Sequence, residues 1–514
     1  MQSRWIVETV LAVAARMVGE ILWAESGSST YHQLGPPEIE VIIVTGDPLP
    51  GQDDEAERFG PPAMAGEGQL AFSHWASLAT LQAIYHHESG VIGPVGIRDD
   101  STIGDEYRIA GGSFGSGDGE VTVNPNGKMV FNTTIRPIDD SGSDDALVAG
   151  SPDGELALVV KDGDPSPDGN GVIGNSKLRP GVINQAGQIA FSNRMVDTEE
   201  GSDDDEAIFF SDGTEAPLEI VMRKGDPVPG STEFTFGDPS TPVINDSGDV
   251  AFLTHFQQVD SAPSGVFAWD GAAIQTISMT GDPWPDCDSQ GLGRHFRFDY
   301  NNAGQMLFAT TCHDFTNSAT TPRLVLLHDG NNLEQIAISG DPIPGLTDKT
   351  YRSFWRVRLN NAGDAVFKYR YTNGSGIGLH DGTLKNIASS DMPAPGGGTF
   401  RSANQAFSNI NINDRGQVVF SASVDDVDGE RRSGVFFYDG NGNVYQILRH
   451  DDALLGSTIK SFSIREGWPT SFQTLDDEGW VGISFRLEDD RRGILVADGN
   501  LAGNRLFRDR FQEH

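Results

Sequence analysis

Four residues near one strand-like segment have side chains that could act on a polysaccharide. His295, Arg294, Arg297 and Tyr300 all lie between positions 294 and 300. Histidine and tyrosine can transfer a proton, and arginine can stabilise negative charge. No spacing motif ties the four together, so the alternative is that the histidine simply lies at the end of a sheet. If the chain is an enzyme, these residues are its catalytic candidates.

Acidic loops provide a second kind of candidate site. Asp164 and Asp168 lie in one loop, and Asp203, Asp204 and Asp205 lie in another. Calcium takes about six to eight oxygen ligands at about 2.3–2.6 Å, and such loops could supply them. Charge runs are more often only hydrated, so calcium is a candidate ligand and no cofactor is required. Asp164 also belongs to a recurring Gly-Asp-Pro motif, whose carboxylate is expected to accept backbone N–H groups in a turn.

The chain contains two cysteines, Cys287 and Cys312. They fit no metal-finger or redox spacing, but both fall in one repeat. We predict a disulfide between them, which would close a loop of about 25 residues. Two separate buried thiols are the alternative.

A recurring Asn-x-x-Gly-x-x-(Ala/Val)-Phe motif organises the whole chain. Six copies begin at Asn124, Asn184, Asn245, Asn301, Asn360 and Asn413, and two divergent copies have Ala65 and Asp476 in the asparagine position. The motif glycines are Gly68, Gly127, Gly187, Gly248, Gly304, Gly363, Gly416 and Gly479. The motif therefore defines eight repeats of about 59 residues.

Each repeat contains four strand-like stretches separated by turn signals. Asp-Gly joins the first two stretches, Gly-Asp-Pro follows the second, and Asn-x-x-Gly joins the third to the fourth. We therefore expect each repeat to form one four-stranded antiparallel meander. A lone meander of this kind cannot bury its faces, so neighbouring repeats must stack. We predict an all-β protein, a single β-propeller of about eight four-stranded blades over residues 38–499. Another blade count, two sub-domains and an open stack are the alternatives.

The two ends of the repeat region supply complementary strands. The region begins near Ile39 with a second strand and ends near Gly493 with a first strand. We therefore predict that both termini complete one blade, with the strand near Val41 beside the strand near Leu495. Pairing these edges would satisfy backbone groups that otherwise invite aggregation.

The repeat motif resembles the NxxGxxAF tandem-repeat family of bacterial secreted or cell-surface proteins. The match extends from about residue 40 to residue 498, and its eight-fold recurrence makes it specific. The tail NRLFRDRFQEH is similar to the endings of some exported proteobacterial proteins. The resemblance implies export and an extracellular, periplasmic or cell-surface location. It brings no catalytic residues with it.

Charge and the N-terminus narrow the possible partners. The 514-residue chain has 36 basic and 74 acidic residues, a net charge of −38, which disfavours nucleic acid and anionic membranes. Residues 1–30 are expected to form a signal peptide or an amphipathic helix, and residues 500–514 a C-terminal tail. No run of 18 apolar residues predicts a membrane span.

We expect a monomeric binding or adhesion scaffold, and a propeller enzyme acting on extracellular polysaccharide is the alternative. Strand direction reverses at every turn, so the short Asp-Gly and Asn-x-x-Gly turns should share one face. The opposite face should carry the variable loops, where a carbohydrate or protein ligand is expected to bind. These loops are residues 73–82, 132–145, 192–206, 253–264, 309–322 and 421–433.

Overall fold

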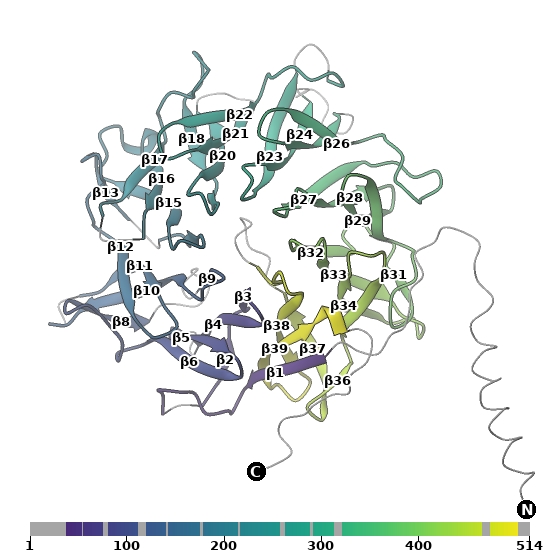
Figure 1. Ribbon diagram of the computed structural model, residues 1–514, viewed down its shortest axis with the longest axis horizontal. Helices are drawn as coiled ribbons and strands as arrows, with labels where there is room; N and C mark the ends of the chain where they lie inside the picture. The colour runs from purple at the N-terminus through teal and green to yellow at the C-terminus, as the bar shows by residue number, and fades with distance from the viewer. Residues whose placement is uncertain are drawn as a thin grey trace, which may run out of the picture. The chain divides into compact units, whose positions relative to one another are not determined.

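Eight antiparallel sheets surround a common axis in the computed structural model of the chain (Figure 1). The structure describes residues 38–53, 55–75, 81–111, 120–139, 142–174, 178–213, 216–257, 263–287, 291–312, 321–464 and 473–501. Within these ranges the regular structure is β-strand apart from two short 3-10 helices, η1 (Gly201–Asp203) and η2 (Gly499–Leu501). This confirms the predicted all-β propeller. The expected signal peptide or helix at residues 1–30 and the tail beyond residue 501 lie outside the described residues.

The sheets are called blades 1 to 8 in chain order. Blade 1 contains β2 (Arg58–Phe59), β3 (Ala63–Gly66), β4 (Gln69–Trp75), β5 (Leu81–Glu88) and β6 (Val91–Ile97), and blade 2 contains β7 (Thr102–Ile103), β8 (Tyr107–Gly111), β9 (Val121–Val123), β10 (Met129–Pro137), β11 (Asp144–Gly150) and β12 (Leu156–Lys161). Blade 3 contains β13 (Val172–Ile173), β14 (Val182–Ile183), β15 (Ile189–Val196), β16 (Glu206–Ser211) and β17 (Glu219–Arg223). Blade 4 contains β18 (Phe236–Pro239), β19 (Val243–Ile244), β20 (Val250–Phe256), β21 (Ser264–Trp269) and β22 (Ile274–Met279).

The other four blades follow the same plan. Blade 5 contains β23 (Leu292–Tyr300), β24 (Met306–Cys312), β25 (Arg323–His328) and β26 (Leu333–Ile338), and blade 6 contains β27 (Ser353–Leu359), β28 (Ala365–Tyr371), β29 (Gly374–His380) and β30 (Leu384–Ser389). Blade 7 contains β31 (Thr399–Phe400), β32 (Phe407–Ile412), β33 (Val418–Asp425), β34 (Arg431–Tyr438) and β35 (Val444–Arg449). Blade 8 contains β36 (Ala453–Leu454), β37 (Ser457–Ser463), β38 (Trp480–Leu487), β39 (Arg492–Asp498) and β1 (Glu38–Val44).

Blade 5 shows how a repeat maps onto a sheet. Its strands pair in the order β23-β24-β25-β26, with β23 nearest the axis (Figure 1). An Asn-x-x-Gly turn joins β23 to β24, an Asp-Gly turn joins β25 to β26, and the Gly-Asp-Pro segment leads to β27 in blade 6. Each blade therefore combines the third and fourth strands of one repeat with the first and second strands of the next. The expectation that each repeat forms one meander is wrong, because the second and third strands of a repeat lie in different sheets.

Both ends of the repeat region complete blade 8, as predicted. Strand β1 pairs antiparallel with β39, and Val41 lies opposite Leu495. The other edge of β39 pairs with β38, where Ile483 also lies opposite Leu495. A strand from the start of the chain thus becomes the outer strand of the last blade.

The hydrophobic core is divided into layers between neighbouring blades. The motif phenylalanines lie in these layers with at most 1% of their surface exposed: Phe72, Phe131, Phe191, Phe252, Phe308, Phe367 and Phe420. Blades 8 and 1 share such a layer, in which Ile43 and Ile494 of blade 8 pack with Phe72 and Tyr85 of blade 1. Burial of apolar surface at every junction, including the closing one, holds the ring together.

The two faces of the ring differ as predicted. Antiparallel pairing places the Asn-x-x-Gly and Asp-Gly turns on one face, called the turn face. It places the Gly-Asp-Pro segments and the long variable connections on the other, called the loop face. No helix in the described part of the chain is long and apolar enough to cross a membrane.

Candidate functional site

The turn between β23 and β24 explains why asparagine recurs in the motif. Asn301 is 3% exposed, and its Oδ1 accepts the backbone N–H groups of Ala303 and Gln305 at 3.1 and 2.9 Å. Gly304 supplies the φ of +74° that the turn requires. The Asn301 Nδ2 group donates to the backbone carbonyl of Asn360 in blade 6 at 2.8 Å. One side chain therefore closes its own turn and links two blades.

The same link recurs around the axis. Amide Nδ2 groups donate to a carbonyl of the next blade at 2.8–2.9 Å, from Asn124 to Asn184, Asn184 to Asn245, Asn301 to Asn360, Asn360 to Asn413 and Asn413 to Asp476. The residue after the motif asparagine makes a second set of hydrogen bonds between blades. Its backbone N–H donates to the side-chain Oδ1 of the equivalent residue in the next blade, from Gln185 to Asp246, Asp246 to Asn302, Asn302 to Asn361, Asn361 to Asp414 and Asp414 to Asp477. These two positions of the motif are therefore structural.

The two divergent copies of the motif meet where the ring closes. Blade 1 has Ala65 in the asparagine position and presents the backbone N–H of Gly68 to blade 8. Asp476 of blade 8 accepts this N–H through Oδ2 at 2.9 Å, while its Oδ1 accepts the N–H of Trp480 at 2.7 Å. A carboxylate replaces the usual amide because the neighbour here is a donor. Burial raises the pKa of Asp476 to about 6.

Asp476 should make stability depend on pH. Its folded-state pKa lies above the ordinary 3.8, so its contribution is fully present below about pH 4 and is lost as pH rises through 6. We expect the wild type to gain about 2–3 kcal/mol relative to Asp476→Asn between pH 7 and pH 4. Urea denaturation of both proteins measures this difference. A stability difference that is the same at both pH values would contradict the assignment.

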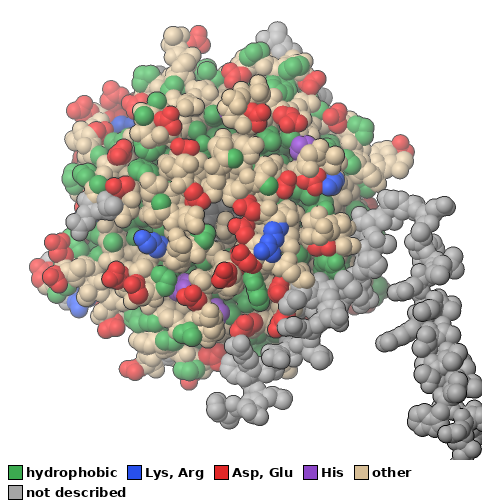
Figure 2. Space-filling view, in the orientation of Figure 1, with side chains coloured by type: hydrophobic (Ala, Val, Ile, Leu, Met, Phe, Trp, Pro, Cys, Tyr) green, Lys and Arg blue, Asp and Glu red, His purple; other side chains and the backbone are tan. Residues whose placement is uncertain are grey.

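A cavity of about 660 Å³ opens at the axis on the turn face and is lined by these same turns. Its acidic lining residues are Glu67, Asp246, Asp299, Asp414, Asp477 and Glu478, against a single basic one, Arg358. Figure 2 shows acidic side chains around the central opening and few basic ones on this face. Most of the lining consists of repeat-equivalent residues in hydrogen bonds between blades, whereas Asp299, Tyr300, Arg358 and Asn411 precede the motif and differ from one repeat to the next.

The Gly-Asp-Pro aspartates cap strand ends on the loop face, as the sequence predicts. In four repeats the carboxylate accepts the backbone N–H three residues earlier at 2.6–2.9 Å, in the pairs Val44–Asp47, Lys161–Asp164, Met279–Asp282 and Arg449–Asp452. The recurrent aspartate therefore serves the blade.

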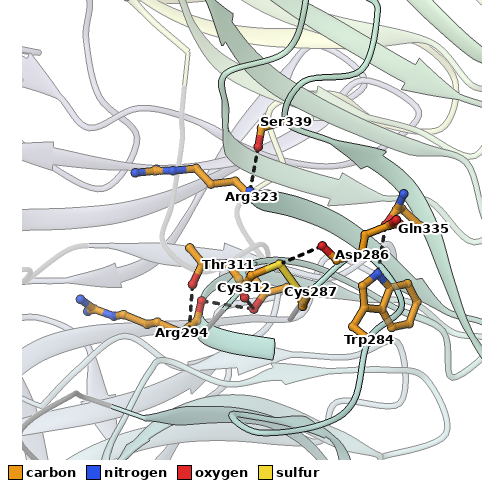
Figure 3. Close-up of a disulfide and its surroundings, with 10 residues drawn as sticks. Trp284, Asp286, Cys287, Arg294, Thr311, Cys312, Arg323, Gln335 and Ser339 are labelled. Carbon is orange, nitrogen blue, oxygen red and sulfur yellow. Dashed lines mark hydrogen bonds between the residues drawn. A yellow bond between two sulfur atoms is a disulfide. The ribbon is translucent and has the colours of Figure 1, made fainter. Parts of the chain in front are cut away.

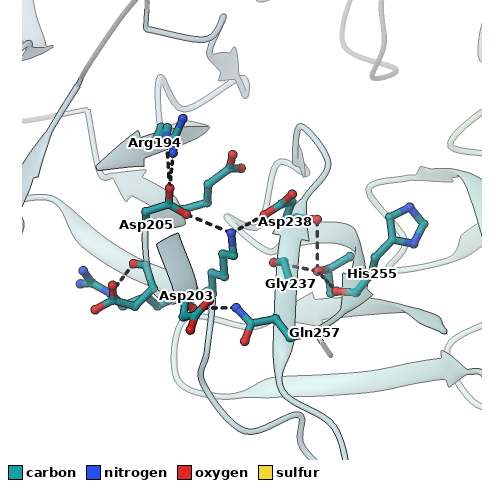
Figure 4. A network of polar contacts seen from close by, with 12 residues as sticks. Arg194, Asp203, Asp205, Gly237, Asp238, His255 and Gln257 are labelled. Carbon is teal, nitrogen blue, oxygen red and sulfur yellow. Dashed lines mark hydrogen bonds and ion pairs between the residues drawn. The ribbon is translucent and has the colours of Figure 1, made fainter. Parts of the chain in front are cut away.

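Several of the calcium candidates have partners within the protein (Figure 4). Asp168 contacts Arg223, Asp204 accepts Asn170 Nδ2 at 2.9 Å, and Asp205 binds Arg194 and Lys224 at 2.7 and 3.0 Å. Asp203 accepts Gln257 Nε2 through its backbone carbonyl at 2.6 Å. In the described ranges no three potential metal ligands are grouped to hold an ion. Calcium binding by these loops stays a prediction.

His295 is enclosed in the protein rather than placed at an open sheet end. It is 0% exposed, and its Nε2 lies 2.9 Å from Ser278 Oγ. Burial lowers its pKa to about 3, so the imidazole is neutral. Register shifts in β23 on both sides of His295 break the strand alternation. The imidazole of His295 therefore has no contact with solvent in this structure, and its catalytic role stays a prediction.

The other catalytic candidates do not join His295 in one pocket. Arg294 lies at the loop-face end of β23, with Nη2 3.2 Å from His255 Nε2. Tyr300 lies at the turn-face end, with its hydroxyl 3.4 Å from Asp249. Six strand positions separate these two residues, about 20 Å at 3.3 Å per residue. Arg297 donates to the carbonyl of its neighbour Phe296 at 2.8 Å.

Cys287 and Cys312 form a disulfide at the loop face of blade 5 (Figure 3). The S–S distance is 2.01 Å and the Cα atoms lie 5.3 Å apart. The bridge ties the segment after the Gly-Asp-Pro corner to the end of β24. Nearby, Trp284 Nε1 donates to Gln335 on β26 at 3.0 Å.

Removing this disulfide should lower the free energy of unfolding by about 3 kcal/mol, because it closes a 25-residue loop. The double variant Cys287→Ala/Cys312→Ala and the reduced wild type should lose the same amount in urea denaturation. Reductant should leave the double variant unchanged. Two free thiols in the non-reduced wild type, found by alkylation and mass spectrometry, would contradict the bridge.

Sequence reasoning missed a group of arginines on the loop face. Arg323, Arg352 and Arg370 line a pocket of about 260 Å³ with Ser353, Trp355 and Asn404. A local charge imbalance was the available signal. Residues 321–372 contain seven basic side chains (Arg323, Lys349, Arg352, Arg356, Arg358, Lys368, Arg370) and five acidic ones (Asp329, Glu334, Asp341, Asp348, Asp364), in a chain of net charge −38.

Several solved propellers are similar to this chain at low identity. The β-propeller domain of the Trilobed protease from Pyrococcus furiosus is 9% identical with a TM-score of 0.39, covering 77% of this chain and 99% of that one. The Dos1 propeller is 8% identical with a TM-score of 0.40, covering 92% and 96%. The Pyrococcus horikoshii acylaminoacyl peptidase is 9% identical with a TM-score of 0.38, covering 76% and 52%, so this chain spans about half its length. Scores this low carry no argument about function.

Sequence comparison gives the family. No curated protein matches the sequence. The resemblance to the NxxGxxAF repeat family stays a prediction. The profile of DUF7453, a family of unknown function, matches residues 83–263 and 258–499. Since these ranges cover most of the chain, the chain belongs to the DUF7453 family.

Proposed function

We propose that the chain is an exported binding scaffold whose loop face holds an extracellular carbohydrate or protein ligand. One observation carries the proposal: most residues at the turn-face opening are repeat-equivalent and bonded between blades, whereas the loop face differs from blade to blade. Function concentrates on variable loops that a rigid framework positions. The closed ring of blades is such a framework.

Two further features support this proposal. The disulfide at the loop face suits an oxidising compartment outside the cytosol. Exposed apolar side chains also occur on the loops, since Ile138 after β10 and Val427 after β33 are 48% and 86% exposed. Apolar groups at loop tips are available for contact with a ligand. The four residues named for the polysaccharide-cleaving alternative do not share a pocket, so their geometry gives that alternative no support.

A glycan array with matched variants tests the proposal. Loop-face variants are Ile138→Asp and replacement of residues 426–430 by Gly and Ser. Turn-face controls are Val91→Asp, at a valine that is 67% exposed, and Glu67→Gln/Glu478→Gln. We expect the loop-face variants to lose glycan binding and the turn-face variants to keep it, with and without calcium. Loss of binding in the turn-face variants alone, in folded protein, would overturn the face assignment.

A further inference from the structure

The three arginines of the small pocket converge from two blades on the loop face. Arg323 begins β25 in blade 5, Arg352 directly precedes β27 in blade 6, and Arg370 lies near the end of β28. Backbone bonds fix their positions, because the N–H of Arg352 donates to the carbonyl of Arg370 at 2.8 Å and the N–H of Arg323 donates to Ser339 Oγ at 3.0 Å. In Figure 3 the side chain of Arg323 extends away from the disulfide with no dashed contact at its guanidinium.

These guanidinium groups have no carboxylate partner in the part of the chain that the structure describes. Arg432, on the same face, is paired with carboxylates: it contacts Asp426, Asp428 and Asp451 at 2.7–3.1 Å. Burial and the charge of Arg352 lower the pKa of Arg323, and burial and Arg323 lower that of Arg370. Three like charges are thus held together in an otherwise acidic protein.

The pocket also holds an unsatisfied donor and a positioned aromatic ring. Arg370 Nε is buried without a hydrogen-bond acceptor. The Arg370 guanidinium carbon lies 4.7 Å from the centre of the Trp355 ring, a cation–π contact that orients it. Trp355 Nε1 donates to Ser353 Oγ at 3.2 Å, which leaves the serine hydroxyl hydrogen available to a ligand. The Ser353 hydroxyl and the outer guanidinium nitrogens can donate to a ligand, whereas Arg370 Nε lies below the surface.

We propose that this pocket binds a small oxyanion, the carboxylate, sulfate or phosphate group of a ligand of the loop face. Guanidinium groups match the geometry of such groups through paired, charge-assisted hydrogen bonds. The volume of about 260 Å³ is below the usual range of ligand pockets, about 300–1,000 Å³, so it suits one charged group rather than a whole large ligand. The net charge of −38 repels long polyanions, which favours a ligand with few charges.

This inference rests on the proposed binding function and names the chemistry of its ligand. Isothermal titration at constant ionic strength, with sodium chloride as reference, tests it with sulfate, phosphate and glucuronate. We expect saturable binding to one site, at least about ten-fold weaker in Arg352→Gln and in Arg370→Gln. Arg415→Gln, which removes an exposed turn-face arginine, should bind like the wild type. Binding of glucuronate indicates a sugar carboxylate, and binding of the inorganic anions alone indicates a free ion.

Stability separates loss of the site from loss of the fold. Without added anion, Arg352→Gln should melt at the same temperature as the wild type or higher, because it removes a repulsive charge. No saturable heat with any of the three anions overturns the proposal, and so does equal binding by Arg352→Gln. Either result leaves the proposed function standing if the loop-face variants still lose glycan binding. Loss of that binding only in the turn-face variants overturns the function whatever the pocket does.

Discussion

Deletion of residues 490–514 should unfold the entire propeller rather than trim its end. Strand β39 pairs with β38 on one edge and with β1 on the other. Its removal leaves β1 without a partner and exposes Ile43 in the layer between blades 8 and 1. Every blade depends on packing against both neighbours, so an opened ring loses a whole apolar interface. We expect no cooperative thermal transition by circular dichroism.

A shorter deletion provides the matched control. Removal of residues 502–514 retains β39 and its pairing with β1, so it should leave the melting temperature within about 1–2 °C of the wild type. A second control, deletion of residues 38–44, removes β1 and should act like the long deletion. A cooperative transition at the wild-type temperature after loss of residues 490–514 would show that closure does not hold the ring.

The architecture follows from features that a single sequence displays. Spacing of the motif glycines gives the number of blades, and Asp-Gly and Asn-x-x-Gly give the turns. Complementary ends predict that the strand near Val41 lies beside the strand near Leu495, and β1 and β39 pair in this way. Each of these features is local or repeats at a fixed period. The division of a repeat between two sheets is less visible, because it depends on which strands pair across the repeat boundary.

The bonds between blades could not be predicted in the same way. Asn301 and Asn360 lie 59 residues apart, and only the ring geometry brings the amide of one to the carbonyl of the other. In the sequence Asp476 is only a departure from the motif asparagine. In the structure its carboxylate accepts the N–H of Gly68 across the blade junction. A divergent repeat can therefore be an adaptation to its neighbour.

Candidate chemistry was harder to predict than the fold, for two physical reasons. Arg294 and Tyr300 lie at opposite ends of one strand, so the length of the strand keeps their side chains apart. His295 is buried because the register of its strand shifts on both sides of it, and the alternation of apolar and polar residues in the sequence does not reveal such shifts. The arginine pocket joins Arg323 with Arg370 across a blade junction, so no sequence motif contains both. Sites built between repeats leave only a local charge imbalance as their signal.

Substitution of Asn301 by alanine should lower the free energy of unfolding by about 3–5 kcal/mol. The change removes an acceptor for the N–H groups of Ala303 and Gln305 and the donor to Asn360 at once. These groups are largely enclosed, and an unsatisfied buried polar group costs about 1–3 kcal/mol. Urea denaturation measures the loss. Asn331→Ala, at an exposed asparagine in an Asp-Gly turn, should stay within about 0.5 kcal/mol of the wild type.

Asn301→Asp separates the two roles of this side chain. It keeps an oxygen for the turn but places a second oxygen against the carbonyl of Asn360, so it should destabilise although it is nearly isosteric. Asp476→Asn should also destabilise at neutral pH, because it places an amide N–H against the N–H of Gly68. The exchange of asparagine for aspartate at one position and of aspartate for asparagine at the other would then both lower the free energy of unfolding. This result is expected if each side chain is matched to the backbone group that it meets across the blade junction. Wild-type stability in both variants would show that the bonds between blades contribute little to the ring.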